Sequence, residues 1–530
     1  MASADSPENG GWKPRHNPWL IAVVVAMAAF MEVLDTSIAN VALPHMAGNL
    51  GASQDQSTWV LTSYLVSNAI VLPITGWLTS IIGRKRFFLI CIVIFTFSSL
   101  LCGIAPSLVF LLMARVVQGA GGGGLQPMAQ AILADIFPPE KRGLAFSLYG
   151  ITAVCAPAIG PTLGGWLTDN YSWRWIFLIN LPVGLITMFL VHVLVDDPPF
   201  LKRKTLRDSR LDYVGLSALA LGIASLQIAL DKGQEDDWFS SHFITTLVII
   251  AVVCLTFLVL WEWYEKDPIV DVRLFKYFNF SASSAMMFLV GAVSFSSTVL
   301  MPQFLQSLMG YTAEKAGMVL STAAIILLIE LPIVGILAGK IQGRFLMAIG
   351  WGMLCIAMYI STKQMDLLIS FRSASILRII QYVPIGLVFI PATTVAYVGI
   401  PQEKSNSVSG LVNFMRNIGS SFGTSAVTTI LAQRSQFHQA RLTEHTAIGH
   451  ANFQNMMSGA SQTAQSMAGN GHPDASQVGL AQIYQTVQTQ AASLSYLDVF
   501  QILMVLGGIM FFLSFLLRGN KPKKQAMAAH

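Results

Sequence analysis

The chain has 530 residues, of which 54% are hydrophobic and only 11% are charged, and its mean hydropathy is +0.60. Soluble domains usually carry about 25% charged residues, so this composition excludes an ordinary soluble protein and predicts an all-α polytopic membrane protein. The net charge of +5 does not indicate a nucleic-acid partner, because most of the basic residues flank apolar segments on one side of the predicted membrane.

Windows of about twenty apolar residues can cross the ~30 Å hydrocarbon core of a bilayer. In chain order these windows predict fourteen transmembrane helices, near 19–43, 57–80, 87–105, 108–133, 143–167, 176–195, 212–230, 243–263, 280–301, 315–339, 345–361, 375–397, 407–432 and 498–517. The polar first eighteen residues do not resemble a cleavable signal, so the first span is expected to remain as an anchor. The five cysteines fall in apolar stretches and are expected to be buried fillers, with no disulfide and no metal site.

Basic residues are divided unequally between the two sides of these spans. If the N-terminus is cytoplasmic, 22 of the 32 Lys and Arg residues fall in cytoplasmic segments and seven in outer segments. The positive-inside rule therefore predicts a multi-pass protein of the cell inner membrane with both termini in the cytoplasm.

An internal repeat divides the chain into two similar parts. LPITGWL at Leu72–Leu78 returns as LPIVGIL at Leu331–Leu337, and RVVQ at 115–118 returns as RIIQ at 378–381, with offsets of 259 and 263 residues. Many secondary transporters contain such duplicated membrane domains. The predicted domains are a six-helix bundle at 1–196, a linker with two inserted spans at 197–276, and a second six-helix bundle at 277–530 that includes a long outer loop at 433–498. That loop is expected either to dock a partner or to act as a passive tether.

Five further motifs stand in order along the first half. They are LDTSIANVALP at 34–44, GWLTSIIGRKR at 76–86, RVVQG at 115–119, APAIGPTLGG at 156–165 and WRWIFLINLPVG at 173–184. Together they resemble the signatures of the fourteen-span drug:proton antiporters of the major facilitator superfamily. The sequence departs from that pattern at Ser80, where the family's loop motif has an acidic residue, and this departure weakens the case for a charge-based latch with Arg84.

This resemblance implies two helical bundles that rock about a central cavity and export lipophilic drugs or toxic amphiphiles by proton-driven antiport. Protons would be the coupling ion, and no other cofactor is expected. The long outer loop is similar to that of EmrB-type exporters, which implies a membrane-fusion adaptor and an outer-membrane channel as partners. A proton-coupled importer and a non-transporting receptor remain as alternatives, whereas an enzyme is not expected because no nucleophile–base set or metal cluster stands out.

Two acidic residues lie within the first span. Glu32 and Asp35 are three positions apart and therefore share one face of a helix. An ionised carboxylate at that depth is costly, so it should be partnered, face a water-filled cavity or take up a proton. Both residues are candidates for proton coupling. Alternatively, Asp35 could hydrogen-bond to nearby backbone, and Glu32 could bind a cationic substrate.

Arg115 is the only basic residue in the fourth span, and the resemblance places it against the first span on the proton route. The alternative is an arginine whose donors bind backbone carbonyls alone. Its repeat mate is Arg378, although the second half can have lost the role. Glu330 in the tenth span, Gln118 and Gln126 join Glu32 as candidate substrate contacts. Glu330 could equally be a pore-lining residue that confers no specificity.

Conformational change is expected to depend on residues that bend helices or allow close packing. In the fifth span, prolines remove backbone hydrogen bonds and glycines allow a neighbouring helix to approach. The candidate gating residues are Pro157, Gly160, Pro161, Gly164 and Gly165 in that span, Gly76, Gly83 and Arg84 in the loop motif, and Arg416 in the thirteenth span. The glycines at 119 and 121–124 are expected to serve helix packing, because no phosphate-binding lysine motif follows them.

Overall fold

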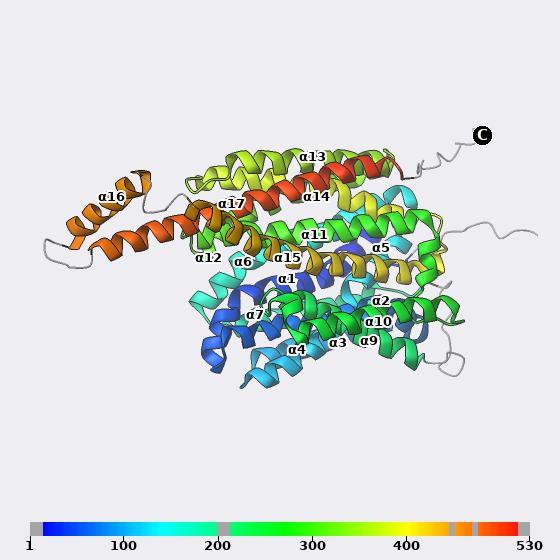
Figure 1. Cartoon of the computed structure of the whole chain (residues 1–530). Coiled ribbons are helices and arrows are strands. Elements are labelled where there is room, and N and C mark those ends of the chain that lie inside the picture. The colour runs from blue at the N-terminus through cyan, green and yellow to red at the C-terminus, as the bar shows by residue number, and fades with distance from the viewer. Residues whose placement is uncertain (1–13, 199–211, 445–450, 469–474, 518–530) are drawn as a thin grey trace, which may run out of the picture.

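The computed structural model describes residues 14–198, 212–444, 451–468 and 475–517, and these residues form helices and no strand. The helices run roughly parallel in one elongated bundle, as Figure 1 shows. The all-α prediction is therefore confirmed.

The first half and the inserted segment contain ten α-helices. Their bounds are α1 Pro18–Leu50, α2 Gln54–Ile82, α3 Arg84–Gly103, α4 Leu108–Gly122, α5 Leu125–Ile136, α6 Pro139–Asn170, α7 Trp175–Leu178, α8 Asn180–Leu194, α9 Tyr213–Lys232 and α10 His242–Tyr264. The second half contributes α11 Phe278–Ser307, α12 Ala313–Ala338, α13 Gly343–Gln364, α14 Phe371–Ala396, α15 Ser405–Glu444, α16 Ala451–Ala468 and α17 Ala475–Ser514. Short 3-10 turns lie at Trp238–Ser240, Val272–Lys276 and Gln402–Lys404.

Each predicted span coincides with helix. Among the described residues, twelve spans are each long and apolar enough to cross a bilayer, and α6 makes a thirteenth when the two parts on either side of its bend are joined. The predicted span 407–432 lies within α15, which is too polar to qualify in this way. Packing explains its place in the bundle, because Gly419 and Gly423 bring the α15 backbone directly against α11.

Local sequence accounts for several helix boundaries. Ser53 and Gln56 form a reciprocal capping box that begins α2, and Asn17 caps the first turn of α1 just before Pro18. The predicted fourth span is divided into α4 and α5 by a turn at Gly123 and Gly124. The predicted fifth span is α6, which bends by 45° between the part that ends at Pro157 and the part that begins at Ile159.

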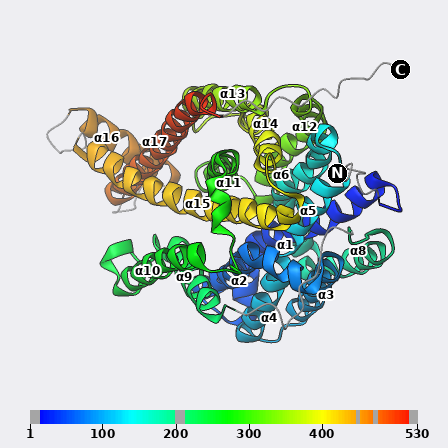
Figure 2. The same cartoon turned by 90° about the vertical axis from the view of Figure 1, so that its right-hand side faces the viewer.

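The two halves meet along several long helix pairs, while the inserted helices lie at the edge of the bundle. Helix α6 of the first half packs on α12 and α14 of the second, and α2 and α5 pack on α15. Helices α9 and α10 pack on each other beside α2 (Figure 2). Helix α1 begins, and α17 ends, at one end of the bundle, which we call the terminal end (Figure 1).

Residues 433–498 were expected to form a loop, but the described part of this segment is helical. Helix α15 continues to Glu444, α16 follows, and α17 already begins at Ala475. These segments form a helical extension that projects from the end opposite the terminal end (Figure 1). At its base, Asp498 accepts hydrogen bonds from Arg434 Nε at 2.5 Å and His438 Nε2 at 2.7 Å.

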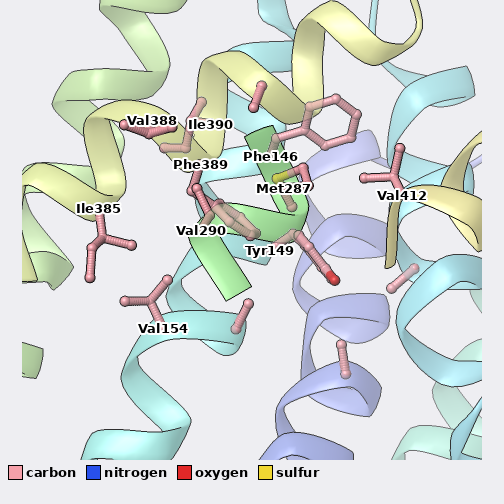
Figure 3. Close-up of a cluster of buried hydrophobic side chains, with 14 of the residues drawn as sticks. Phe146, Tyr149, Val154, Met287, Val290, Ile385, Val388, Phe389, Ile390 and Val412 are labelled. Carbon is pink, nitrogen blue, oxygen red and sulfur yellow. The ribbon is translucent and has the colours of Figure 1, made fainter. Parts of the chain in front are cut away.

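An apolar cluster fills the region where the halves meet. Figure 3 shows side chains from α6, α11, α14 and α15 that point toward one another, including Tyr149, Met287, Phe389 and Val412. All four are nearly or fully buried. This cluster adjoins the candidate site, because the hydroxyl of Tyr149 lies 3.0 Å from Gln126 Oε1.

Candidate functional site

Asp35 lies at the centre of a buried polar network in the first half. Its Oδ2 accepts a hydrogen bond from Arg115 Nη1 at 2.6 Å, which is also an ion pair. Its Oδ1 accepts from Gln118 Nε2 at 3.0 Å and from Asn180 Nδ2 at 2.7 Å, and Asn180 also donates to Ser99 Oγ. Three helices, α1, α4 and α8, therefore converge on one carboxylate, as a buried charge requires.

Arg115 is fully buried and has more than one kind of partner. Besides the ion pair with Asp35, its Nε donates to the carbonyl oxygen of Val60 at 3.1 Å. Its guanidinium carbon lies 4.2 Å from the centre of the Tyr64 ring and 5.5 Å from that of Phe177. The arginine thus faces the first span as predicted, and it binds both an acidic group and a backbone carbonyl.

Glu32 lies in a second buried network one helical turn away from Asp35. Its Oε1 accepts from Tyr64 Oη at 3.1 Å and from Asn68 Nδ2 at 3.0 Å. Its Oε2 accepts from Gln126 Nε2. No basic side chain forms an ion pair with Glu32 in the described part of the chain, so neutral donors alone hold this carboxylate.

Gln126 connects this network to the second half. Arg416 Nη2, on α15, donates to Gln126 Oε1. The hydroxyl of Tyr149 also reaches Gln126 Oε1, at 3.0 Å, and lies 2.7 Å from Asn413 Oδ1 on α15. Asn413 Nδ2 then donates to Gln130 Oε1 at 2.6 Å. Glu32 is therefore linked to α15 by side-chain hydrogen bonds.

The two predicted glutamine contacts have different surroundings. Gln118 is fully buried, donates to Asp35, and accepts from Arg115 Nη1 at 2.8 Å, so both ends of its amide belong to the Asp35 network. Gln126 lies where the two halves meet. The structure thus brings Glu32, Asp35, Arg115, Gln118, Gln126 and Arg416 into one region.

Glu330 lies apart from this region, on α12. Both of its carboxylate oxygens are buried, and neither has a hydrogen-bond partner in the structure. A Cβ added to Gly386 on α14 would lie 2.7 Å from the nearer of these oxygens. The glycine therefore leaves room for the carboxylate between α12 and α14.

A small cavity of about 20 Å³ lies between the halves, lined by residues of α6, α11, α14 and α15 that include Pro157 and Arg416. Pockets for drug-sized molecules usually measure about 300–1,000 Å³, so this cavity is too small to hold such a molecule in this conformation.

The gating candidates of the fifth-span motif are not equivalent. A Cβ on Gly160 would lie 2.3 Å from Ser37 Oγ, and one on Gly164 would lie 3.0 Å from the Ile38 side chain, so both glycines let α6 approach α1. By contrast, a Cβ on Gly165 would meet nothing within 4 Å. The carbonyl oxygen of Pro157, freed at the bend, accepts from Ser37 Oγ at 3.1 Å. Pro161 follows the bend within the second part of α6.

The loop-motif residues lie at the terminal end, where the halves touch. A Cβ on Gly76 would lie 2.3 Å from Ser407 Oγ on α15, and Gly83 has a φ of +90°, which favours glycine. Arg84 has an acidic partner despite the serine at position 80. Its Nη1 pairs with Asp135 at the end of α5, and its Nη2 donates to Ser405 Oγ of α15 at 3.1 Å.

Several neutral residues of the site were not predicted from the sequence. Asn180 lies within the WRWIFLINLPVG motif, so that motif carried the only signal for it. Tyr64, Asn68, Tyr149 and Asn413 are polar residues within helices of the membrane-spanning bundle. Polar residues at such positions are costly unless they are partnered, and this is a general signal that could have singled them out.

Comparisons with known proteins agree with this architecture. Residues 25–424 match the Major Facilitator Superfamily. The chain is similar to the multidrug export protein EmrB of Escherichia coli, with 40% identity over 463 residues that cover 86% of this chain and 90% of that protein. It is also similar to the fatty acid resistance protein FarB of Neisseria gonorrhoeae, with 38% identity over 80% of this chain and 83% of that protein.

A solved structure supports the fold at lower sequence identity. The crystal structure of the human organic anion transporter MFSD10 covers 94% of this chain and all of that chain, with a TM-score of 0.57 and 14% identity. At this identity the likeness concerns the fold alone.

Proposed function

Because the chain belongs to the Major Facilitator Superfamily, and within it to the group of EmrB-type multidrug export proteins, we propose that it exports lipophilic drugs or other toxic amphiphiles by proton-driven antiport. The observation that carries the coupling step is the pair of buried carboxylates on α1. Asp35 is paired with Arg115, and Glu32 is linked through Gln126 to Arg416 in the other half.

In the proposed cycle, protonation of Glu32 weakens its hold on Gln126, because a neutral carboxyl group is a poorer acceptor than a carboxylate. Gln126 is then free to separate from Arg416 or to move with it, and α15 can shift relative to α1. Asp35 and Arg115 form the second proton-sensitive pair, since protonation of Asp35 would leave the guanidinium without its buried counter-charge. Proton uptake thereby favours a different arrangement of the halves, as alternating access requires.

The membrane potential supplies enough free energy to drive export against a concentration gradient. One charge that moves down a membrane potential of ~100 mV releases about 2.3 kcal/mol. At about 1.4 kcal/mol per tenfold change, this supports a concentration gradient of roughly fortyfold for a cargo exchanged against one proton.

We further propose that the terminal end faces the cytoplasm, as the distribution of basic residues predicts. The contacts of Arg84, Asp135 and Ser405 would then close the cytoplasmic side. Close packing of Gly143 against Gly335 supports this closure, because a Cβ on Gly143 would lie 2.4 Å from the carbonyl oxygen of Gly335.

The proposed cargo is lipophilic, which agrees with two relatives that are a multidrug export protein and a fatty acid resistance protein. The cavity between the halves, with its apolar lining and Arg416, would be part of the binding region when it opens. Glu330 remains a candidate contact for cationic cargo, since its carboxylate is buried without a hydrogen-bond partner on α12, a helix that packs on α6 of the first half.

A membrane-fusion adaptor and an outer-membrane channel are the proposed partners. The helical extension of α15, α16 and α17 supports this proposal, because it projects beyond the bundle at the proposed outer end (Figure 1).

The test is export by purified protein in liposomes with an imposed pH gradient. We expect Asp35→Asn to remain folded in the membrane and to lose gradient-driven export of a lipophilic dye, because the variant cannot exchange a proton. Asp55→Asn is the matched control, since Asp55 is an exposed residue at the start of α2. Export that survives in Asp35→Asn would refute the assignment. Uptake in the opposite direction would favour an importer, and absence of any flux would favour a receptor.

A further inference from the structure

The second half contains a copy of the Arg115 site. Arg378 and Gln381 correspond to Arg115 and Gln118 at an offset of 263, and Ser297 corresponds to Asp35 at an offset of 262. The geometry is also repeated. Arg378 Nη1 donates to Ser297 Oγ at 2.8 Å, and the Ser297 hydroxyl donates to Gln381 Oε1 at 3.2 Å.

The copy lacks both acidic residues. Serine stands opposite the arginine where the first half has Asp35, and Ser294 corresponds to Glu32 at the same offset of 262. Arg378 is fully buried, and it contacts the carbonyl and hydroxyl of Ser297, the hydroxyl of Thr298 and the ring of Tyr382, whose centre lies 3.9 Å from the guanidinium carbon. No acidic residue in the described ranges forms an ion pair with it.

Two polar atoms in this copy have no partner. The Nε of Arg378 and the Oγ of Ser294 are buried without a hydrogen bond. A buried guanidinium that lacks a counter-charge is costly, and neutral hydroxyls compensate it less well than a carboxylate does. The site therefore has an excess positive charge and spare donors in an otherwise apolar region.

This copy adjoins the cavity between the halves. Ser294, Thr298 and Tyr382 line that cavity together with Arg416. Thr298 and Tyr382 also contact Arg378, so the cavity and the buried guanidinium share a polar wall. The remaining lining is apolar and includes Val154, Val290, Ile385 and Phe389, which point toward one another in Figure 3.

We propose that this polar wall, with Arg378 behind it, binds the anionic head group of a carboxylate amphiphile, whose apolar tail lies against α6 and α14. The inference rests on the proposed export function and deepens it, because it assigns the head-group contact to the second half. The two repeats then have different tasks. The first half has acidic residues and handles protons, while the second half has serines at the corresponding positions and supplies the positive charge for the cargo.

The test compares two fluorescent probes that share a twelve-carbon tail, one with a carboxylate head and one with a trimethylammonium head. Binding is measured at equilibrium with the full chain in phosphatidylcholine nanodiscs and without a proton gradient. We expect the intact protein to bind the carboxylate probe more tightly. Arg378→Gln should weaken that binding by about tenfold or more, as expected for loss of a charge-assisted contact, and leave the ammonium probe unaffected.

Ser297→Asp is the second variant. It keeps Arg378, so its result does not depend on whether the protein folds without that arginine. It restores the first-half pattern by giving Arg378 an internal counter-charge, so the fold should be retained. Carboxylate binding should fall, and ammonium binding should be unchanged or tighter. Unchanged carboxylate binding in Ser297→Asp would overturn the proposal. So would equal losses for both probes in Arg378→Gln, or a preference of the intact protein for the ammonium probe.

A further arm distinguishes a carboxylate amphiphile from a bilayer lipid. Adding phosphatidylglycerol to the nanodiscs should leave carboxylate binding unchanged, and strong competition by this lipid would reassign the site to lipid head groups and overturn the proposal. Because binding is measured without a gradient, these results are independent of proton coupling. If Asp35→Asn still exported dye while the probes behaved as expected, proton coupling would be refuted and the anion site would stand.

Discussion

Glu32 and Arg416 belong to opposite halves of the molecule, and both bind the same side-chain amide, that of Gln126. Gln126 donates to the carboxylate of Glu32 through Nε2 and accepts from the guanidinium of Arg416 through Oε1. An amide that donates on one side and accepts on the other transmits a change of charge at Glu32 to Arg416. This contact is therefore where proton uptake in one half can be sensed by the other.

The first prediction concerns this amide. Gln126→Leu keeps a similar volume but removes both hydrogen bonds, which leaves Glu32 and Arg416 without this shared partner. A buried polar group left unsatisfied costs about 1–3 kcal/mol. We expect proton-driven export to fall by roughly tenfold, with the protein still folded. The measurement is the initial rate of dye export from liposomes at a fixed pH gradient.

The matched control is Gln227→Leu. Gln227 is a buried glutamine on α9 that donates to Ser421 and lies outside both acidic networks. Its substitution should leave the coupling of export to protons intact. Equal rates in Gln126→Leu and the unmodified protein would show that the amide does not connect the halves functionally.

The second prediction compares the effects on export of substituting two glycines of α6, Gly160 and Gly165, which belong to the same motif. A Cβ at Gly160 would collide with Ser37 on α1, whereas a Cβ at Gly165 would lie in open space. Gly160→Ala should force α6 away from α1 and reduce export strongly, and Gly165→Ala should have little effect. Export rates normalised to the amount of protein in the membrane test this contrast. Similar losses in both variants would mean that the motif acts through something other than close packing.

The transmembrane spans could be predicted, because long apolar runs are a strong sequence signal. The prediction of secondary structure failed in the polar segments. Helix α15 contains few long apolar windows, and its continuation to Glu444 has no sequence signal of membrane insertion. The same polarity made 433–498 look like a loop. Its helices are rich in residues such as Gln, Ala and Met, which favour helix without marking a buried face.

The charged part of the site was also predictable, because a lone charge within an apolar run is conspicuous. Asp35 and Arg115 belong to this class, and the structure pairs them. Asn180 and Asn413 are neutral, and only folding brings them to their partners from distant positions. Asp135 is charged but was not predicted. It lies at the end of another span, 51 positions after its partner Arg84, so only folding brings the two together.

The third prediction concerns the terminal end. Asp135→Asn removes the counter-charge of Arg84, whose contact with Ser405 joins the first half to α15. Loss of one partner of a buried ion pair costs about 3–5 kcal/mol, so the closed arrangement should be populated less. A cysteine introduced at the fully buried Ser409, in a variant without the native cysteines, should then react faster with maleimide.

Asp271→Asn serves as the control for this experiment. It removes a partly exposed ion pair with Lys404, 2.6 Å long, directly before Ser405. Exposed pairs contribute only about 0–1 kcal/mol, so labelling should change little. If both variants left the labelling rate unaltered, Arg84 and Asp135 would not hold this end closed.

The fourth prediction concerns backbone conformation between α2 and α3. Gly83 has φ +90° and ψ 150°, a region that side-chain-bearing residues adopt at a cost of about 1–3 kcal/mol. Gly83→Ala should therefore lower the thermal stability of the purified protein. Gly48→Ala is the control, because Gly48 is helical and a Cβ there meets nothing within 4 Å. A Gly83→Ala protein as stable as Gly48→Ala would contradict the assigned conformation.

The fifth prediction tests the role of the helical extension with a second pair of glycines. Gly479 on α17 is buried against α16, where a Cβ would lie 2.9 Å from Ser461 Oγ, while Gly459 on α16 is exposed. Gly479→Leu should push α16 away from α17, and Gly459→Leu should not. If the extension docks an adaptor, Gly479→Leu should abolish drug resistance in cells that have an outer membrane and yet preserve export in liposomes. Loss of export in liposomes as well would assign the extension to the transport cycle itself, and full resistance in cells would mean that the packing of α16 on α17 is not needed for docking.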